Sequence, residues 1–336
     1  MSNKLRIGMN CHRWGAPYAS YPKEMVETNL DTCKELGLDM IRFNQSCHTV
    51  EDIDCVSYFA DEALKRGMTL MHVIDDGTWK NPSDTVKTEE LEKYYEDYMY
   101  RISSRLKGKI EVYQVFNEMD VTGMRGDIAN IILPGKDGKE KGEYDSVMFD
   151  RAIVAVRGAL KGIKKGDPGA KTCVNFAWWH TAMIYAMYDA GCRFDVVGLD
   201  WYSDCEDVSS IDLVIDDVKK HIPDSDFMIC ETNFWMHPMG RDPIEKQEAL
   251  KVDEKRYEGQ AKWVPEFIQK VIDLNEPKMK AIFFYELMDE PIFERQRGSY
   301  HGESHFGFIA CDEDGTNQVK KPAFYSLKKK IEEIKK

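Results

Sequence analysis

The chain has 336 residues, of which 43% are hydrophobic and 31% charged, and its formal net charge is −13. This length and composition suit a globular protein, and we expect residues 1–336 to form one domain. The acidic balance argues against nucleic acid or an anionic membrane surface as a partner. No run of apolar residues approaches the ~20 needed to span a bilayer.

Cysteine usage bears on the redox setting. There are nine cysteines, an odd number, with no CxxC pair, and Cys173 and Cys230 lie in apolar, strand-like runs. A free thiol in such a run behaves as a small hydrophobe. The start, "MSNKLRIGMNCHRW", lacks the apolar core of a signal peptide. We therefore expect a reduced, cytoplasmic protein without a structural zinc site, although a secreted protein whose signal had been trimmed would look the same.

Short, β-rich apolar runs alternate with longer segments whose apolar residues recur at helical spacing. In chain order, the expected strand and helix pairs are 5–14 and 22–38, 40–46 and 50–67, 68–76 and 88–108, 110–120 and 149–166, 170–180 and 181–191, 194–204 and 209–222, 226–235 and 259–274, and 279–290 and 321–336. Eight such units predict an α/β protein with the (β/α)8 TIM-barrel fold. A doubly wound open sheet is the alternative, but it would usually carry a glycine-rich phosphate turn where this chain has "CHRWGAP".

In a barrel of this kind, the active site lies at the C-terminal ends of the strands. The fourth expected strand ends in "VYQVFNEMD" (112–120), which contains Glu118, and the seventh ends in "MICETNFW" (228–235), which contains Glu231. A charge at the end of a buried strand is costly unless something nearby uses it. Hydrolysis of a glycosidic bond needs two carboxyl groups, one to protonate the leaving oxygen and one to attack the anomeric carbon or activate water. Glu118 and Glu231 are therefore the candidate catalytic residues.

Other strand ends carry groups that suit a sugar site. Arg42 could keep Glu231 ionised, because a neighbouring cation lowers the pKa of a carboxyl group. Tyr202 could donate a hydrogen bond to the same group, and Asn117 could bind a sugar hydroxyl. Asp120, one step beyond the strand, is expected to be a loop residue.

Aromatic side chains can stack on the apolar faces of sugar rings. Further candidate substrate-binding residues near the strand ends are Trp14, His72, Trp79, Trp201, Trp235 and Tyr285. His72 lies within its strand and could equally be a hydrogen-bonded histidine of the barrel wall. The direction of Trp201 is open, because adjacent residues of a strand point opposite ways.

These motifs resemble the clan of retaining β-glycoside hydrolases built on (β/α)8 barrels, which includes cellulases, mannanases, galactanases and β-xylosidases. The resemblance implies that Glu118 of "VFNEMD" is the acid/base, Glu231 of "MICETNFW" the nucleophile, Arg42 of "MIRFN" its support and Tyr202 of "DVVGLDWYSD" an active-site aromatic residue. Within the clan, "DDGTWKNP" (75–82) and "DVVGLDWYS" are similar to segments of endo-β-1,4-galactanases. The glycine expected before Asn-Glu is Phe116 here, and Tyr285 or Trp235 could replace the missing strand-eight tryptophan.

We therefore predict a retaining β-glycoside hydrolase that acts on β-linked oligosaccharides or polysaccharides without a cofactor or metal. The sugar, the linkage and the oligomeric state stay open. A metal-dependent sugar isomerase or epimerase is the first alternative, with ligands drawn from His12, His72, Asp76, Glu118, His180 and Glu231. A non-catalytic sugar-binding barrel is the second.

Overall fold

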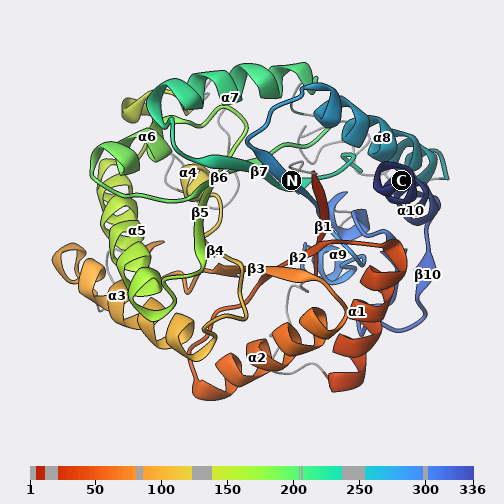
Figure 1. The fold of residues 1–336 in the computed structure, drawn as a ribbon, viewed down its shortest axis with the longest axis horizontal. Helices are drawn as coiled ribbons and strands as arrows, with labels where there is room; N and C mark the ends of the chain where they lie inside the picture. Colours follow the sequence, from red (N-terminus) through yellow and green to blue (C-terminus); the bar gives the residue numbers. More distant parts are fainter. Residues whose placement is uncertain are drawn as a thin grey trace.

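Eight parallel strands close into a barrel in which each strand pairs with the next and β8 pairs with β1 (Figure 1). The protein is represented by a computed structural model, which describes residues 5–11, 22–80, 86–122, 138–203, 205, 207–236, 254–297 and 302–336. The strands are β1 (Arg6–Asn10), β2 (Met40–Asn44), β3 (Thr69–Ile74), β4 (Val112–Val115), β5 (Lys171–Ala177), β6 (Val196–Asp200), β7 (Asp226–Thr232) and β8 (Met279–Phe284). The predicted single-domain (β/α)8 fold is confirmed.

Helices surround the barrel as an outer ring (Figure 1). They are α1 (Lys23–Leu36), α2 (Val50–Lys65), α3 (Thr88–Arg105), α5 (Ser146–Gly166), α6 (Ala182–Asp189), α7 (Ser209–His221), α8 (Glu254–Asp273) and α10 (Pro322–Lys335). Every expected strand and helix is present, although the strands are shorter than their apolar runs. Local signals fix several helix ends. In α2, for example, the Thr49 side chain accepts a bond from the Asp52 backbone N–H and the Asp52 carboxylate accepts one from the Thr49 N–H.

The barrel interior is filled by side chains from alternate residues of the strands. One buried cluster there comprises Met40, Met71, Val112, Cys173, Val196, Met228, Cys230, Ala281 and Phe283. Gly8 of β1 is required for this packing, because a Cβ atom at that position would lie 2.5 Å from the Phe283 ring. Cys173 and Cys230 thus act as small hydrophobes, as predicted, and all nine cysteines are free thiols. Because side chains fill the interior, a ligand could bind only at the ends of the strands.

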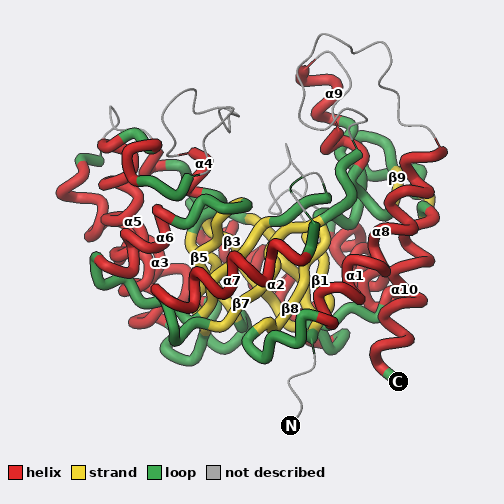
Figure 2. The backbone as a smooth tube through the Cα atoms, turned by 90° about the horizontal axis from the view of Figure 1, so that it is seen from above, coloured by secondary structure: helices red, strands yellow, loops and turns green. Residues whose placement is uncertain are grey.

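Additional elements extend from the C-terminal end of the barrel (Figure 2). The short helix α4 (Met119–Thr122) follows β4, and α9 (Ile292–Arg297) follows β8. An antiparallel pair, β9 (Ile309–Ala310) and β10 (Val319–Lys320), then leads into α10. Short 3-10 turns cover Thr78–Lys80, Lys141–Glu143 and Gly302–His305. None of the helices in the described ranges is long and apolar enough to cross a membrane.

Candidate active site

The Arg42 side chain organises the C-terminal end of the barrel. It is 1% exposed, and its guanidinium group donates four hydrogen bonds. They reach Gln114 Oε1 at 2.9 Å, Asn10 Oδ1 at 2.5 Å, Glu231 Oε1 at 2.9 Å and Asn117 Oδ1 at 2.7 Å. The planar guanidinium fork suits such simultaneous contacts, and a buried arginine stays charged. Arg42 therefore joins the ends of β1, β2, β4 and β7 around one fixed positive charge.

Glu231 at the end of β7 receives a second donor from β6. The Tyr202 hydroxyl donates to Glu231 Oε2 at 3.0 Å. Burial, followed by the proximity of Glu231, raises the pKa of Tyr202 well above its usual range, so its hydroxyl keeps its proton. Both predicted contacts of Glu231, with Arg42 and with Tyr202, are present. Each carboxylate oxygen thus accepts one hydrogen bond, and this arrangement stabilises the ionised form.

Glu118 follows β4 through an unusual backbone turn. Phe116 has φ +63° and Glu118 has φ +43°, both in the left-handed region where only glycine is free of steric cost. Phe116 occupies the position at which the resemblance led us to expect glycine, and it is fully buried against Tyr95 and Trp79, with ring centroids 4.9 Å and 6.1 Å away. The Glu118 backbone N–H donates to Asn175 Oδ1 of β5 at 3.1 Å. Packing and this hydrogen bond hold the turn that presents Glu118.

Asn117 has its amide oxygen turned into the barrel. Its Oδ1 accepts bonds from Arg42, from Gln114 Nε2 at 3.0 Å and from Asn175 Nδ2 at 3.0 Å. The amide oxygen is thus fully used, whereas the amide nitrogen of Asn117 has no hydrogen-bond acceptor among the described residues. Its two N–H donors are available for a ligand hydroxyl beside Glu118.

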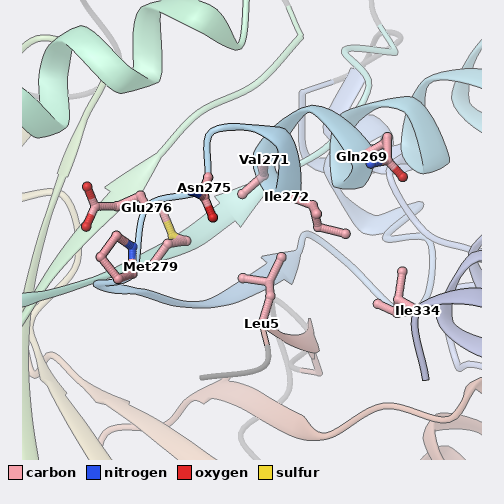
Figure 3. Close-up of a pocket in the computed structure, with 9 residues that line it drawn as sticks. Leu5, Gln269, Val271, Ile272, Asn275, Glu276, Met279 and Ile334 are labelled. Atoms are coloured by element: carbon pink, nitrogen blue, oxygen red, sulfur yellow. The ribbon is translucent and has the colours of Figure 1, made fainter. Parts of the chain in front are cut away.

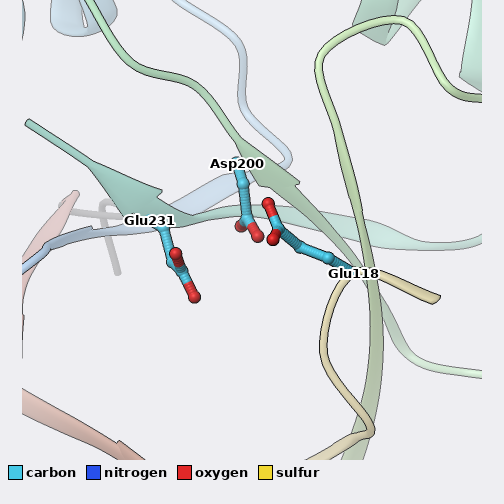
Figure 4. A group of neighbouring side chains, drawn as sticks. All are labelled: Glu118, Asp200 and Glu231. Carbon is cyan, nitrogen blue, oxygen red and sulfur yellow. The ribbon is translucent and has the colours of Figure 1, made fainter. Parts of the chain in front are cut away.

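A third carboxyl group, that of Asp200 at the end of β6, lies between the two predicted ones (Figure 4). One oxygen of each of Glu118, Asp200 and Glu231 lies within 4.8 Å of the others, and we call these three residues the carboxylate cluster. Two unit charges at 4.8 Å repel by about 3 kcal/mol at an effective dielectric constant of about 20. Burial, and then Glu231 and Glu118, raise the pKa of Asp200 well above its usual range. The strand-end pattern contained Asp200, but nothing in the sequence distinguished it from other acidic residues.

Aromatic side chains line the side of the site formed by β6, β7 and β8. Tyr202 stacks on Phe306, with ring centroids 5.5 Å apart, and meets Trp235 edge-on at 5.8 Å. Tyr285 packs in the same group. Of these rings, Trp235 is the partly exposed one, so it offers the most surface to a ligand. Phe306, which no sequence motif indicated, supports the Tyr202 ring by stacking on it.

Three of the predicted substrate-binding residues are corrected by the structure. Trp79 and Trp201 are 0% exposed and belong to the hydrophobic core between strands and helices. Trp201 lies between Asp200 and Tyr202 and points the opposite way from both, because strand side chains alternate. His72 is also fully buried, with Nε2 2.9 Å from the Gln45 carbonyl oxygen, and burial lowers its pKa to about 4. These three side chains cannot contact a substrate, and Trp14 lies outside the described residues.

A buried pair near Glu118 was not expected. Asp120 is 1% exposed, and its Oδ2 accepts bonds from His180 Nδ1 at 2.8 Å and from the Ala177 N–H at 3.0 Å. The prediction of a loop residue at Asp120 is therefore wrong, because its carboxylate ties the start of α4 to the end of β5. Its position two residues after Glu118 means that this link restrains the segment carrying Glu118.

Of the ligands proposed for the alternative metal site, Glu118 and Glu231 come together, but the described histidines and Asp76 do not join them. His72 faces the helix layer, Asp76 accepts bonds from two tyrosine hydroxyls of α3, and His180 is bound to Asp120. His12 lies outside the described residues. Among the residues that are described, the carboxylate cluster is the group that could hold an ion. Arg42 already supplies a positive charge to that cluster.

A separate pocket of about 580 Å³ lies at the other end of the barrel (Figure 3). It is lined by Leu5, Gln269, Val271, Ile272, Asn275, Glu276, Pro277, Met279 and Ile334. Leu5 precedes β1 and Met279 begins β8, so the pocket opens where the strands start. Its one acidic side chain, Glu276, is paired with Lys219 at 2.9 Å. This pocket therefore lacks a group of neighbouring carboxyl groups such as the one at the opposite end.

Comparisons with known proteins agree with this geometry. A family model described as "Glycosyl hydrolase family 53" matches residues 41–307. A search of curated proteins finds no match. Among solved structures, the fold is similar to that of a family 1 β-glucosidase from Thermotoga maritima (TM-score 0.66, 13% identity, 97% of each chain covered). It is also similar to a hyperthermophilic β-glucosidase from Pyrococcus furiosus (TM-score 0.68, 9% identity, 98% of this chain and 95% of that chain covered).

Proposed function

This chain belongs to glycosyl hydrolase family 53, and on that premise we propose that Glu118 and Glu231 cleave a β-glycosidic bond by double displacement. Family membership and the closed barrel confirm the predicted place in the clan of retaining (β/α)8 β-glycoside hydrolases. The observation that carries the residue assignment is the approach of the two carboxyl groups, with an oxygen of each within 4.8 Å. Retaining enzymes hold them about 5–5.5 Å apart, whereas inverting enzymes need about 6.5–9.5 Å to admit a water.

In the first step, protonated Glu118 donates its proton to the leaving glycosidic oxygen. Ionised Glu231 attacks the anomeric carbon from the opposite face, so that a glycosyl–enzyme ester forms as the bond to the leaving group breaks. In the second step, Glu118 takes a proton from water, the water oxygen attacks the anomeric carbon, and Glu231 leaves as a carboxylate. Arg42 and Tyr202 stabilise Glu231 in its ionised form before the first step and after the second.

The substrate class follows from the site and from local sequence. Asn117 supplies amide donors for a sugar hydroxyl, and Trp235 supplies a partly exposed aromatic surface. Because residues 75–82 and 195–203 resemble segments of endo-β-1,4-galactanases, β-1,4-linked galacto-oligosaccharides are the first substrates to test. Degradation of the corresponding polysaccharide is the wider role that we propose.

The stereochemistry of the product tests this mechanism directly. We expect a panel of aryl β-glycosides and β-linked oligosaccharides to contain a substrate whose first-formed hydrolysis product is the β-anomer, observed by proton NMR before mutarotation. Two successive inversions at the anomeric carbon produce this net retention. A first-formed α-anomer would show that water attacks directly and would exclude Glu231 as the nucleophile.

Replacing Tyr202 by phenylalanine is expected to lower kcat by about 10–100-fold, since a hydrogen bond to a charged group contributes about 1.5–3 kcal/mol. The variant loses the donor to Glu231 Oε2 but keeps the ring that stacks on Phe306. Steady-state kinetics measure the loss. The matched control is Tyr113→Phe, which removes a buried hydroxyl on the outer face of β4 and should leave kcat unchanged. Equal kcat values for the two variants would contradict the role given to Tyr202.

A further inference from the structure

The Asp200 carboxyl group is built into the active site although the double-displacement mechanism does not use it. It is 2% exposed, and its Oδ2 accepts a hydrogen bond from Asn175 Nδ2 at 2.6 Å. Its Oδ1 is buried and has no hydrogen-bond partner among the residues that the structure describes. Figure 4 shows this carboxyl group between those of Glu118 and Glu231. An unpartnered buried oxygen beside two other carboxyl groups requires an explanation.

Asn175 connects Asp200 to the acid/base. Its Nδ2 donates to Asp200 Oδ2 and to Asn117 Oδ1, and its Oδ1 accepts the backbone N–H of Glu118. The carboxyl group of Asp200 therefore helps to fix the amide whose other end holds the turn carrying Glu118. A substitution of Asp200 can therefore alter the backbone position of Glu118, because Asn175 is hydrogen-bonded to both residues.

The charges around Asp200 disfavour a further negative charge at this position. The ionisable groups that face it are Arg42 from β2, Glu118 after β4, Tyr202 after β6, and Cys230 and Glu231 from β7. Among these, Arg42 is the one cation, and it is in contact with Glu231. Double displacement keeps one carboxylate ionised at each stage, first Glu231 and then Glu118. The single arginine balances that one charge and no second one.

We propose that Asp200 is a positioning residue that stays protonated through the catalytic cycle, with its proton on Oδ1 directed at the Glu118 and Glu231 carboxyl groups. This inference rests on the proposed function of those two glutamates. Because Oδ2 accepts from an amide N–H, the acid proton resides on Oδ1. That oxygen then supplies a donor in a cluster otherwise made of acceptors. Burial and the two neighbouring glutamates, which raise the pKa of Asp200, act in the same direction.

Two substitutions separate the protonated carboxyl group from an ionised one. Asp200→Asn keeps an acceptor for Asn175 and places an N–H donor where the O–H was, so we expect kcat to fall less than about tenfold. Asp200→Ala removes both the acceptor and the donor, and it frees the Asn175 amide that holds Glu118. We therefore expect kcat to fall by about 100-fold, the size of effect that a misplaced catalytic group produces. Equal losses in the two variants would overturn the proposal. If Asp200→Ala fails to fold, the pH dependence of kcat/KM and of Tm in Asp200→Asn tests the proposal.

The pH profile of kcat/KM distinguishes a neutral Asp200 from an ionised one. An ionised Asp200 would hold the pKa of Glu118 up by charge repulsion, and its replacement by asparagine would shift the alkaline limb about one pH unit lower. A neutral Asp200 predicts that the alkaline limb of Asp200→Asn stays in place or moves higher. The matched control is Asp216→Asn, which removes one exposed carboxylate from α7 and should reproduce the wild-type profile.

Thermal unfolding tests the protonation state without any assay of activity. A carboxyl group whose pKa is raised by folding stabilises the protein fully below its unfolded pKa of about 3.9, and that stability is lost as the pH rises through the folded value. Asparagine does not titrate. The Tm of Asp200→Asn minus the Tm of the wild type should therefore increase by about 2 °C or more between pH 4 and pH 8. A Tm difference (variant minus wild type) that stays constant or decreases between pH 4 and pH 8 would overturn the proposal. An error in the roles of Glu118 and Glu231 would leave this measurement unaffected.

Discussion

Replacing Glu231 by glycine is expected to abolish turnover, with kcat lower by about 10⁴-fold or more, the scale seen when a nucleophile is removed. Among the described residues, the other carboxyl groups of the cluster are those of Asp200, which is 2% exposed and hydrogen-bonded to Asn175, and of Glu118, to which we assign the role of proton donor. Initial rates on an aryl β-glycoside measure the loss, and circular dichroism verifies the fold. Full activity in this variant would exclude Glu231 as the nucleophile.

A small anion provides the control for the Glu231→Gly variant. Sodium azide can enter the space left by the carboxylate and attack an activated aryl β-glycoside from the same face. Because a single displacement replaces two, the expected product is the α-glycosyl azide. A β-glycosyl azide from this variant would mean that another group of the protein still forms the covalent intermediate.

Replacing Glu118 by alanine is expected to lower kcat/KM on oligosaccharides by about 10²–10⁴-fold, the usual contribution of a general acid–base group. A sugar leaving group needs a proton, whereas a dinitrophenolate leaves without one. The first step on a dinitrophenyl glycoside should therefore be nearly preserved, and the glycosyl–enzyme should accumulate because water lacks its base. A burst of dinitrophenol followed by slow turnover, measured by stopped-flow absorbance, is the expected signature.

Azide distinguishes this variant from the Glu231 variant. In Glu118→Ala it can attack the glycosyl–enzyme in the space that the acid/base occupied, which gives a β-glycosyl azide and restores turnover. Equal losses on dinitrophenyl and oligosaccharide substrates would contradict the assignment of Glu118 as the proton donor. The opposite anomers expected from the two variants assign the two carboxyl groups to opposite faces of the sugar.

Much of the fold could be read from the chain alone. Eight apolar runs alternating with helical periodicity predicted the barrel, because buried parallel strands and amphipathic helices impose different spacings on apolar residues. The barrel in turn identified the strand ends as the place for chemistry. Glu118 and Glu231 stood out there, since a carboxylate directly after an apolar strand is costly unless it is used. The sequence also suggested the contacts of Glu231 with Arg42 and Tyr202, and the structure shows both of them.

The direction and surroundings of single side chains could be decided only by the tertiary structure. Trp79 and Trp201 both follow barrel strands, but their rings pack in the core. Trp201 does so because side chains alternate along a strand, and Trp79 because the turn Thr78–Lys80 directs it against Phe116. Asp200 and Asp120 look like any other acidic residues in the sequence. Burial beside Glu231 makes the first a third carboxyl group of the site, and contact with His180 makes the second a link between α4 and β5. Periodicity fixes which element a residue occupies, whereas the pKa of its carboxyl group depends on neighbours that only folding brings within a few ångströms.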